Sequence, residues 1–243
     1  MNKIILLTVS MIISNYSFGQ LKEVTYSENS QELKGLVGKP KSGNAGVLIL
    51  PAWKGIDNEA KEAAKNLAEA GYISFIADIY GVGNTPATNE EAGKAAGYYK
   101  TNFEAYQKRI KAGLDELIKQ GADPNKIVVI GYCFGGTGAL EAARGQLPVQ
   151  AAVSIHGGLS KGNRQNVPIK TKVLVLHGAD DASVSKADID LLTEELNAGK
   201  TDWQMIYYAQ SKHTFTNPES ADYNEIMAKR SWEHLMLFLK EVL

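Results

Sequence analysis

The single cysteine of the chain, Cys133, lies in a segment whose neighbours would make its thiol a nucleophile. The segment reads Gly-Tyr-Cys-Phe-Gly-Gly at 131–136, after an apolar run at 127–130 and before a helical stretch at 137–144. A strand, then Gly-x-nucleophile-x-Gly, then a helix is the pattern of a nucleophile elbow, a strained turn that presents the reactive atom. Because a helix N-terminus favours thiolate over thiol, the pattern predicts a reactive Cys133 and an oxyanion donor in the Phe134 backbone N–H.

Two other interpretations of this glycine-rich turn are open at this point. Cys133 could be a buried structural residue, or the turn could bind phosphate. A phosphate loop is disfavoured, because no Lys-Ser or Lys-Thr follows the glycines and no spaced-glycine fingerprint leads to an acid at a strand end. The choice between a structural and a reactive cysteine therefore depends on which base and acid the chain supplies.

A candidate base, His213, comes late in the chain, where α/β-hydrolases place theirs after the nucleophile and the acid. It lies in a loop between an expected last strand at 203–208 and a closing helix at 224–242. The other histidines lack this context. Two stand at strand ends, where they would line a site or pack, and one lies within the closing helix: His156, His177 and His234. We therefore predict His213 as the base.

The candidate acids are two adjacent aspartates, Asp180 and Asp181, that follow an expected strand at 173–176. Both come between the nucleophile and the base, as the chain order of such hydrolases requires. We favour Asp181, because Gly178 lets the chain turn so that the later carboxylate faces inward. Asp180 would then be solvated or would cap a turn.

The elements that must position these residues alternate between strand and helix. Apolar runs predict buried strands, amphipathic spacing predicts helices between them, and Asp57 is predicted to cap the first helix. The expected strands are 46–50, 72–77, 127–130, 151–155, 173–176 and 203–208, with helices at 60–68, 103–118, 137–144, 185–196 and 224–242. Segments 23–26 and 33–37 could form an antiparallel edge hairpin, and 81–97 is expected to be a surface loop or a lid. This order predicts an α/β fold with a mostly parallel sheet covered on both faces.

The first 19 residues have the layout of a secretory signal peptide. Lys3 supplies a positive charge, residues 4–13 are apolar, and 14–20 turn small and polar, with cleavage expected between Gly19 and Gln20. The apolar run is shorter than the about 20 residues of a membrane-spanning helix. The alternative is a disordered or core-packed N-terminus. We expect an exported protein, periplasmic or secreted, with no stable membrane insertion after cleavage and a single domain at 20–243.

The composition is that of a single globular domain and does not indicate a nucleic-acid binder. The 243 residues are 44% apolar and 22% charged, which suits one globular domain of ordinary size. A formal net charge of −1 and scattered basic residues do not indicate a nucleic-acid binder. The sequence predicts no oligomeric state.

Four short motifs stand out along the chain: the elbow at 131–136, Val-Ser-Ile-His-Gly-Gly at 153–158, Leu-His-Gly-Ala-Asp-Asp at 176–181, and His-Thr-Phe at 213–215. With these motifs the chain resembles the dienelactone hydrolase family, from about Leu33 to the end. The resemblance implies the α/β-hydrolase fold, a triad of Cys133, His213 and Asp181, and no cofactor or metal. It also implies a second oxyanion donor, the backbone N–H of Trp53.

Two positions depart from the best-known branch of that family. Those members carry a glutamate that assists thiol activation where this chain has Ala52, and an arginine that holds a substrate carboxylate where this chain has Asn217. Activation is therefore expected to rest on His213 and the helix N-terminus. A carboxylate-bearing dienelactone is not the expected substrate.

The predicted activity is that of a carboxylesterase acting on a small, fairly neutral ester or lactone through a thioester acyl-enzyme. Two other functional classes are considered as alternatives to this hydrolase. A catalytically retired, hydrolase-fold binding protein would explain Ala52 and Asn217, and a thiol redox protein would use Cys133 with an external resolving thiol.

Overall fold

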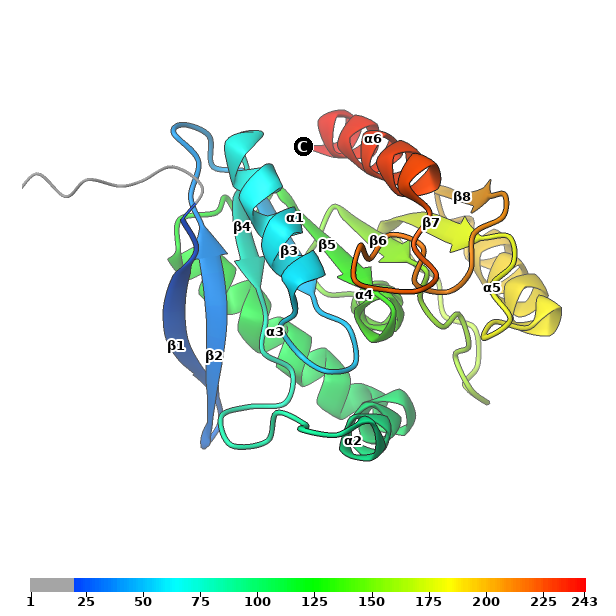
Figure 1. Ribbon diagram of the computed structural model, residues 1–243, viewed down its shortest axis with the longest axis horizontal. Helices are drawn as coiled ribbons and strands as arrows, with labels where there is room; N and C mark the ends of the chain where they lie inside the picture. The colour runs from blue at the N-terminus through cyan, green and yellow to red at the C-terminus, as the bar shows by residue number, and fades with distance from the viewer. Residues whose placement is uncertain (1–19) are drawn as a thin grey trace, which may run out of the picture.

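The apolar runs of the sequence form neighbouring strands of one eight-stranded sheet, in the order β1-β2-β4-β3-β5-β6-β7-β8 (Figure 1). The computed structural model describes residues 20–243, so the predicted signal peptide lies outside the described residues. The strands are β1 (Lys22–Glu28), β2 (Gln31–Gly38), β3 (Gly46–Leu50), β4 (Ile73–Ile76), β5 (Ile127–Tyr132), β6 (Ala151–Ile155), β7 (Lys172–Gly178) and β8 (Trp203–Tyr208).

The sheet is mostly parallel, as the sequence predicts. Strands β4, β3, β5, β6, β7 and β8 pair in parallel, while β1 and β2 form the expected antiparallel hairpin at one edge. Strand β2 joins this hairpin to β4 in antiparallel pairing. Because parallel strands all end at the same edge of a sheet, the loops after β3, β5, β7 and β8 lie near one another there.

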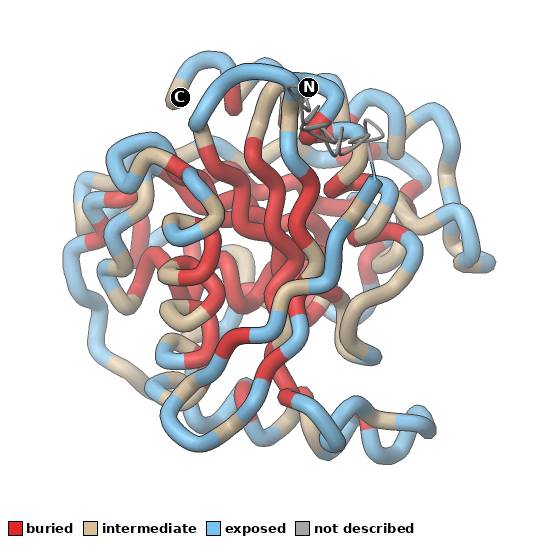
Figure 2. The backbone as a smooth tube through the Cα atoms, turned by 90° about the vertical axis from the view of Figure 1, so that its left-hand side faces the viewer, coloured by how far each residue is buried: buried red, intermediate tan, exposed pale blue. Residues whose placement is uncertain are grey.

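Helices cover both faces of the sheet. They are α1 (Asn58–Glu69), α2 (Asn89–Thr101), α3 (Phe103–Lys119), α4 (Phe134–Arg144), α5 (Lys186–Ala198) and α6 (Glu225–Val242). Helices α1 and α6 pack on one face, and α2, α3, α4 and α5 contribute to the core on the other. The central strands are buried along their length (Figure 2). In residues 20–243, no helix combines the length and the hydropathy of a membrane-spanning segment.

Helix α1 illustrates how local sequence sets an element of the site. The side chain of Asp57 accepts a hydrogen bond from the Ala60 backbone N–H at 2.9 Å, which confirms the predicted N-cap. Alanines and Leu67 bury one face of the helix against the sheet. Glu59 lies in the first turn and is buried as well, with 9% of its surface exposed.

The expectation of a surface loop over residues 81–97 was wrong from residue 89 onwards, because helix α2 begins at Asn89. The alternative expectation, a lid, stays a prediction. Thr88 and Glu91 form a capping box that fixes its start. Its apolar periodicity is weak, since among its described residues only Ala92, Ala96 and Tyr99 are buried. Helix α4 also begins earlier than the predicted 137, directly after Cys133.

Candidate active site

Cys133 occupies the turn between β5 and α4 in a backbone conformation that non-glycine residues rarely adopt. Its φ is +53° and its ψ is −112°, so the strained elbow expected from the sequence is present. A Cβ atom at Gly131 would overlap the carbonyl of Gly135, and one at Gly135 would overlap the carbonyl of Leu50. The two glycines of the elbow are therefore required by the close approach of the chain to itself.

The fold brings Cys133, His213 and Asp181 together in one hydrogen-bonded line. The Nε2 atom of His213 lies 3.0 Å from the Sγ of Cys133, and its Nδ1 lies 2.8 Å from the Oδ2 of Asp181. Asp181 follows β7, and its backbone N–H donates to the carbonyl of Gly178 at 3.1 Å, which makes the predicted turn. His213 comes from the loop between β8 and α6.

The carboxylate of Asp181 is buried and fully engaged. Its Oδ1 accepts hydrogen bonds from the backbone N–H of Ser183 at 2.9 Å and from the Ser183 hydroxyl at 2.6 Å. Burial raises the pKa of Asp181, but the hydrogen bonds from His213 and Ser183 outweigh it and hold the pKa at about 2. Asp180 is exposed. The sequence does not reveal Ser183, whose hydroxyl also lies 2.8 Å from the His213 Nδ1.

His213 retains its proton well above neutral pH. Burial lowers the pKa of its imidazole, but the hydrogen bonds to Asp181 and to Cys133 outweigh this and raise the pKa to about 10. At neutral pH the site therefore holds an imidazolium 3.0 Å from the sulfur. A positive charge at that distance stabilises the thiolate, which is the form of cysteine that reacts as a nucleophile.

Two tyrosines hold the backbone segments that were predicted to supply oxyanion donors. Tyr106 donates to the Phe134 carbonyl at 3.0 Å, and Tyr80 donates to the Trp53 carbonyl at 2.6 Å. The Phe134 ring is stacked with both tyrosine rings, with its centroid 5.9 Å from that of Tyr80 and 4.7 Å from that of Tyr106. Phe134 is the first residue of α4, where backbone N–H groups have no carbonyl partner within the helix.

The remaining histidines lie outside the reach of the thiol. His177 is buried at the end of β7, where burial lowers the pKa of its imidazole. The Nδ1 of His234 lies 2.8 Å from the Tyr208 hydroxyl. His156 contacts the Cys133 backbone, with its Nδ1 3.2 Å from the Cys133 nitrogen. Of the four, His213 is the one whose ring nitrogen is hydrogen-bonded to Sγ among the described residues.

The two positions that depart from the best-known branch carry no group of the same chemistry. The methyl side chain of Ala52 can neither donate nor accept a hydrogen bond. Asn217 uses its Oδ1 to accept from the Glu219 backbone N–H at 2.9 Å, and so stabilises its own turn. Across residues 20–243, no group of three or more His, Cys, Asp or Glu side chains is arranged to hold a metal ion.

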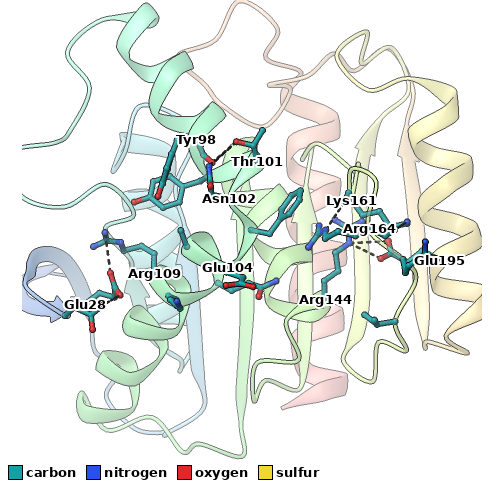
Figure 3. Close-up of a pocket in the computed structure, with 18 residues that line it drawn as sticks. Glu28, Tyr98, Thr101, Asn102, Glu104, Arg109, Arg144, Lys161, Arg164 and Glu195 are labelled. Carbon is teal, nitrogen blue, oxygen red and sulfur yellow. Dashed lines mark hydrogen bonds and ion pairs between the residues drawn. The ribbon is translucent and has the colours of Figure 1, made fainter.

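A cavity of about 940 Å³ lies away from this line of residues, between α2, α3 and the segment after β6 (Figure 3). At one end Arg144 pairs with Glu195 at 2.8 Å, and at the other Arg109 pairs with Glu28 at 3.7 Å. Neither Cys133 nor its hydrogen-bonded partners line it. The arginines at its two ends are therefore engaged in ion pairs within the protein.

Comparison with known proteins decides the family. The sequence profile of the dienelactone hydrolase family matches residues 33–243. The chain belongs to this family. The resemblance drawn from the motifs is therefore confirmed, and membership of the dienelactone hydrolase family makes the protein an enzyme of the hydrolase class.

Individual relatives support the same assignment. The crystal structure of a dienelactone hydrolase-like promiscuous phosphotriesterase from metagenomic libraries is 29% identical, with a TM-score of 0.86, and the match covers 92% of this chain and 98% of that one. A protein of Aquifex pyrophilus named "Protein usf" is 26% identical over 93% of this chain and 99% of its own. A Bradyrhizobium protein named "Probable 2-oxo-3-(5-oxofuran-2-ylidene)propanoate lactonase" is 23% identical over 80% of this chain and 82% of its own.

Proposed function

We propose that this protein hydrolyses small, neutral carboxylic esters or lactones, with Cys133 as the covalent nucleophile. The observation that carries the proposal is the continuous line from the Cys133 sulfur through His213 to Asp181, with contacts of 3.0 and 2.8 Å. Family membership and a relative named as a lactonase support the choice of substrate class. A line of nucleophile, base and orienting acid at a strained elbow is the arrangement that acyl transfer requires.

In the first half of the proposed reaction, the thiolate of Cys133 attacks the carbonyl carbon of the ester. The backbone N–H groups of Phe134 and Trp53 donate to the oxyanion that forms. When the tetrahedral intermediate collapses, the bond to the leaving oxygen breaks, and the imidazolium of His213 gives its proton to that oxygen. The alcohol leaves, and the acyl group stays on sulfur as a thioester.

In the second half, the neutral imidazole of His213 takes a proton from water, and the resulting hydroxide attacks the thioester carbonyl. The carbon–sulfur bond then breaks, the carboxylic acid leaves, and the thiolate–imidazolium pair is restored. Asp181 keeps the His213 Nδ1 protonated and its ring oriented throughout.

Position 52 is an alanine, so no glutamate at this position assists activation of the thiol. In this chain the positive charge near the sulfur comes from His213, whose pKa is about 10, and from the N-terminus of α4. Asn217 carries no charge that would select an anionic substrate. We therefore propose an uncharged acyl group.

The test is turnover of p-nitrophenyl esters of increasing acyl length and of simple lactones by the wild type, Cys133→Ala and His213→Ala. Asp180→Asn serves as the matched control, because Asp180 is exposed and adjacent to the proposed acid. We expect kcat to fall by about 10³-fold or more in both site variants and to stay within twofold in the control. A wild type that turns over no ester or lactone, although its thiol is alkylated by iodoacetamide, contradicts the proposal. Consumption of peroxide in its place would favour redox chemistry.

We also propose that the protein is exported, on the strength of the charged, apolar and small-residue order of residues 1–20. Expression of the full chain in a bacterial host, followed by fractionation and N-terminal sequencing, tests this. We expect the exported form to begin at Gln20. Retention of the uncleaved chain in the cytoplasm would contradict it.

A further inference from the structure

A second line of hydrogen bonds starts at the backbone of Cys133 and leads into the interior of the protein. The Cys133 nitrogen lies 3.2 Å from the Nδ1 of His156, whose Nε2 lies 2.7 Å from the Thr216 Oγ1. The Thr216 hydroxyl in turn donates to the Oε1 of Glu59 at 2.5 Å. His156 is fully buried, Glu59 is 9% exposed, and Thr216 is half-buried.

The direction of every bond in this line follows from its two ends. A backbone N–H can only donate, so the His156 Nδ1 must accept, and the proton of the neutral ring is on Nε2. Nε2 then donates to Thr216, and the Thr216 hydroxyl is free to donate to the Glu59 carboxylate. The Cys133 N–H is shared with the carbonyl of Ile155 at 3.0 Å, so two acceptors hold it.

The line is built from elements that the sheet brings together from distant parts of the chain. Glu59 comes from the first turn of α1, His156 follows β6 directly, and Thr216 lies three residues after His213. His156 has a φ of +41°, a conformation that side-chain-bearing residues rarely adopt. Strained backbone and buried polar groups persist where the surroundings hold them in place, and they cluster at functional sites.

The same imidazole also contacts the loop that carries the proposed base. The His156 ring packs edge-on against the His213 ring, with centroids 5.5 Å apart, and edge-on against Phe215 at 5.8 Å. His156 thus contacts both Cys133 and His213, the two residues that must stay in contact for catalysis. One contact is with the backbone of the nucleophile, and the other is with the ring and loop of the base.

We propose that His156, held by Thr216 and Glu59, is a positioning residue for the hydrolysis. It fixes the Cys133 backbone relative to the His213 loop and so maintains the 3.0 Å contact between Sγ and Nε2. It does not touch the reacting atoms. The inference rests on the proposed function for its effect on turnover, but its effect on the reactivity of the thiol can be measured without a substrate.

Thr216 offers the sharpest test, because two substitutions of similar size separate the hydrogen bonds from the packing. Thr216→Val keeps the shape and removes the hydroxyl, whereas Thr216→Ser keeps the hydroxyl. We expect Thr216→Val to lower kcat by about tenfold with KM within about twofold, because valine breaks both hydrogen bonds of the Thr216 hydroxyl. Thr216→Ser should restore kcat to within about twofold of the wild type. Equal kcat in Thr216→Val and the wild type, or equal losses in both variants, would overturn the positioning role.

Alkylation of Cys133 by iodoacetamide separates this inference from the proposed function. If no ester is hydrolysed by the wild type, slower alkylation of Thr216→Val than of Thr216→Ser would still support the positioning role, and equal rates would overturn it. Should Thr216→Val fail to fold by circular dichroism, Glu59→Leu decides, with Glu59→Gln as its control. Leucine removes the acceptor of the Thr216 hydroxyl, and we expect the alkylation rate to fall about threefold or more, whereas glutamine keeps an oxygen acceptor and should keep the rate within about twofold. An unchanged rate in Glu59→Leu would then overturn the proposal.

Discussion

Replacing Asp181 with asparagine is expected to move the titration of His213 to lower pH while the protein stays folded. Asparagine has nearly the same shape and can still accept the hydrogen bonds from Ser183. With its oxygen engaged by Ser183, the amide nitrogen of the asparagine takes the place of Oδ2, so the substitution removes both the negative charge and the acceptor 2.8 Å from the His213 Nδ1. Both losses destabilise the imidazolium and act in the same direction on its pKa.

The size of the shift follows from the charges around the ring. The pKa of His213 is about 10, against an ordinary 6.5, and Asp181 and Cys133 are the two groups that raise it. An adjacent opposite charge shifts a pKa by about 1 to 3 units. We therefore expect the His213 pKa to fall to about 7 to 9 in Asp181→Asn, with the thiolate of Cys133 supplying the remaining stabilisation of the imidazolium.

The assay compares alkylation of Cys133 by anionic iodoacetate and by neutral iodoacetamide as the pH is raised. Because the chain has one cysteine, the mass of the intact protein reports on this thiol alone. The imidazolium attracts the anionic reagent. The alkylation rate with iodoacetate divided by the rate with iodoacetamide should therefore fall as His213 loses its proton. The midpoint is expected near pH 10 in the wild type and between about 7 and 9 in Asp181→Asn.

Asp180→Asn is the matched control, since Asp180 is the neighbouring exposed acid. Its midpoint should equal that of the wild type. A midpoint shared by Asp181→Asn and the wild type, or a midpoint moved by Asp180→Asn in place of Asp181→Asn, would show that Asp181 does not hold the His213 proton.

Further predictions concern the Tyr80 hydrogen bond, the Arg144 ion pairs and the pH dependence of stability. Tyr80→Phe removes the 2.6 Å bond to the Trp53 carbonyl and should lower kcat about three- to tenfold in steady-state ester turnover, and an unchanged kcat would show that this loop is fixed otherwise. Arg144→Met leaves the buried Glu195 without its ionic partner, while Glu141 keeps its pair with Arg164. The free energy of unfolding in urea should fall by about 3–5 kcal/mol, so a loss below about 1 kcal/mol would contradict the pairing. The pKa of Asp181 is about 2 in the folded protein against an ordinary 3.8, so the contribution of Asp181 to the free energy of unfolding should be present above pH 3.8 and lost as the pH falls towards 2. The pKa of His213 is raised from 6.5 to about 10, so its contribution should be complete below pH 6.5 and lost as the pH rises towards 10. Midpoints of urea unfolding that stay constant across both pH ranges would argue against these shifts.

Much of the fold is predictable because its strands and most of its helices carry strong local patterns. The run at 46–50 is apolar throughout and is fully buried in β3, and Asp57 caps α1 as its position before an amphipathic stretch indicates. The elbow at Cys133 is predictable for the same reason, since the turn, its glycines and the following helix are all local.

Other parts depend on contacts that spacing does not reveal. Helix α2 (Asn89–Thr101) has glycines and small residues and buries few side chains, so its pattern is weak. Glu59 and Thr216 lie 157 positions apart and meet because α1 and the loop after β8 share one edge of the sheet. No local pattern marks Glu59 as anything but a charge in the first turn of a helix.

The most direct test of covalent catalysis by Cys133 is the mass of the protein quenched in acid during turnover of p-nitrophenyl acetate. A thioester survives acid, so the acyl-enzyme can be trapped and its position located by peptide mapping. We expect one acetyl group on Cys133 in the wild type and none in Cys133→Ala. In His213→Ala, which lacks the base for deacylation, a larger fraction of the protein should carry the acetyl group when a more reactive acetyl ester is used to form it. Ester turnover that persists in Cys133→Ala, with no acetyl group on Cys133 in the wild type, would contradict the account.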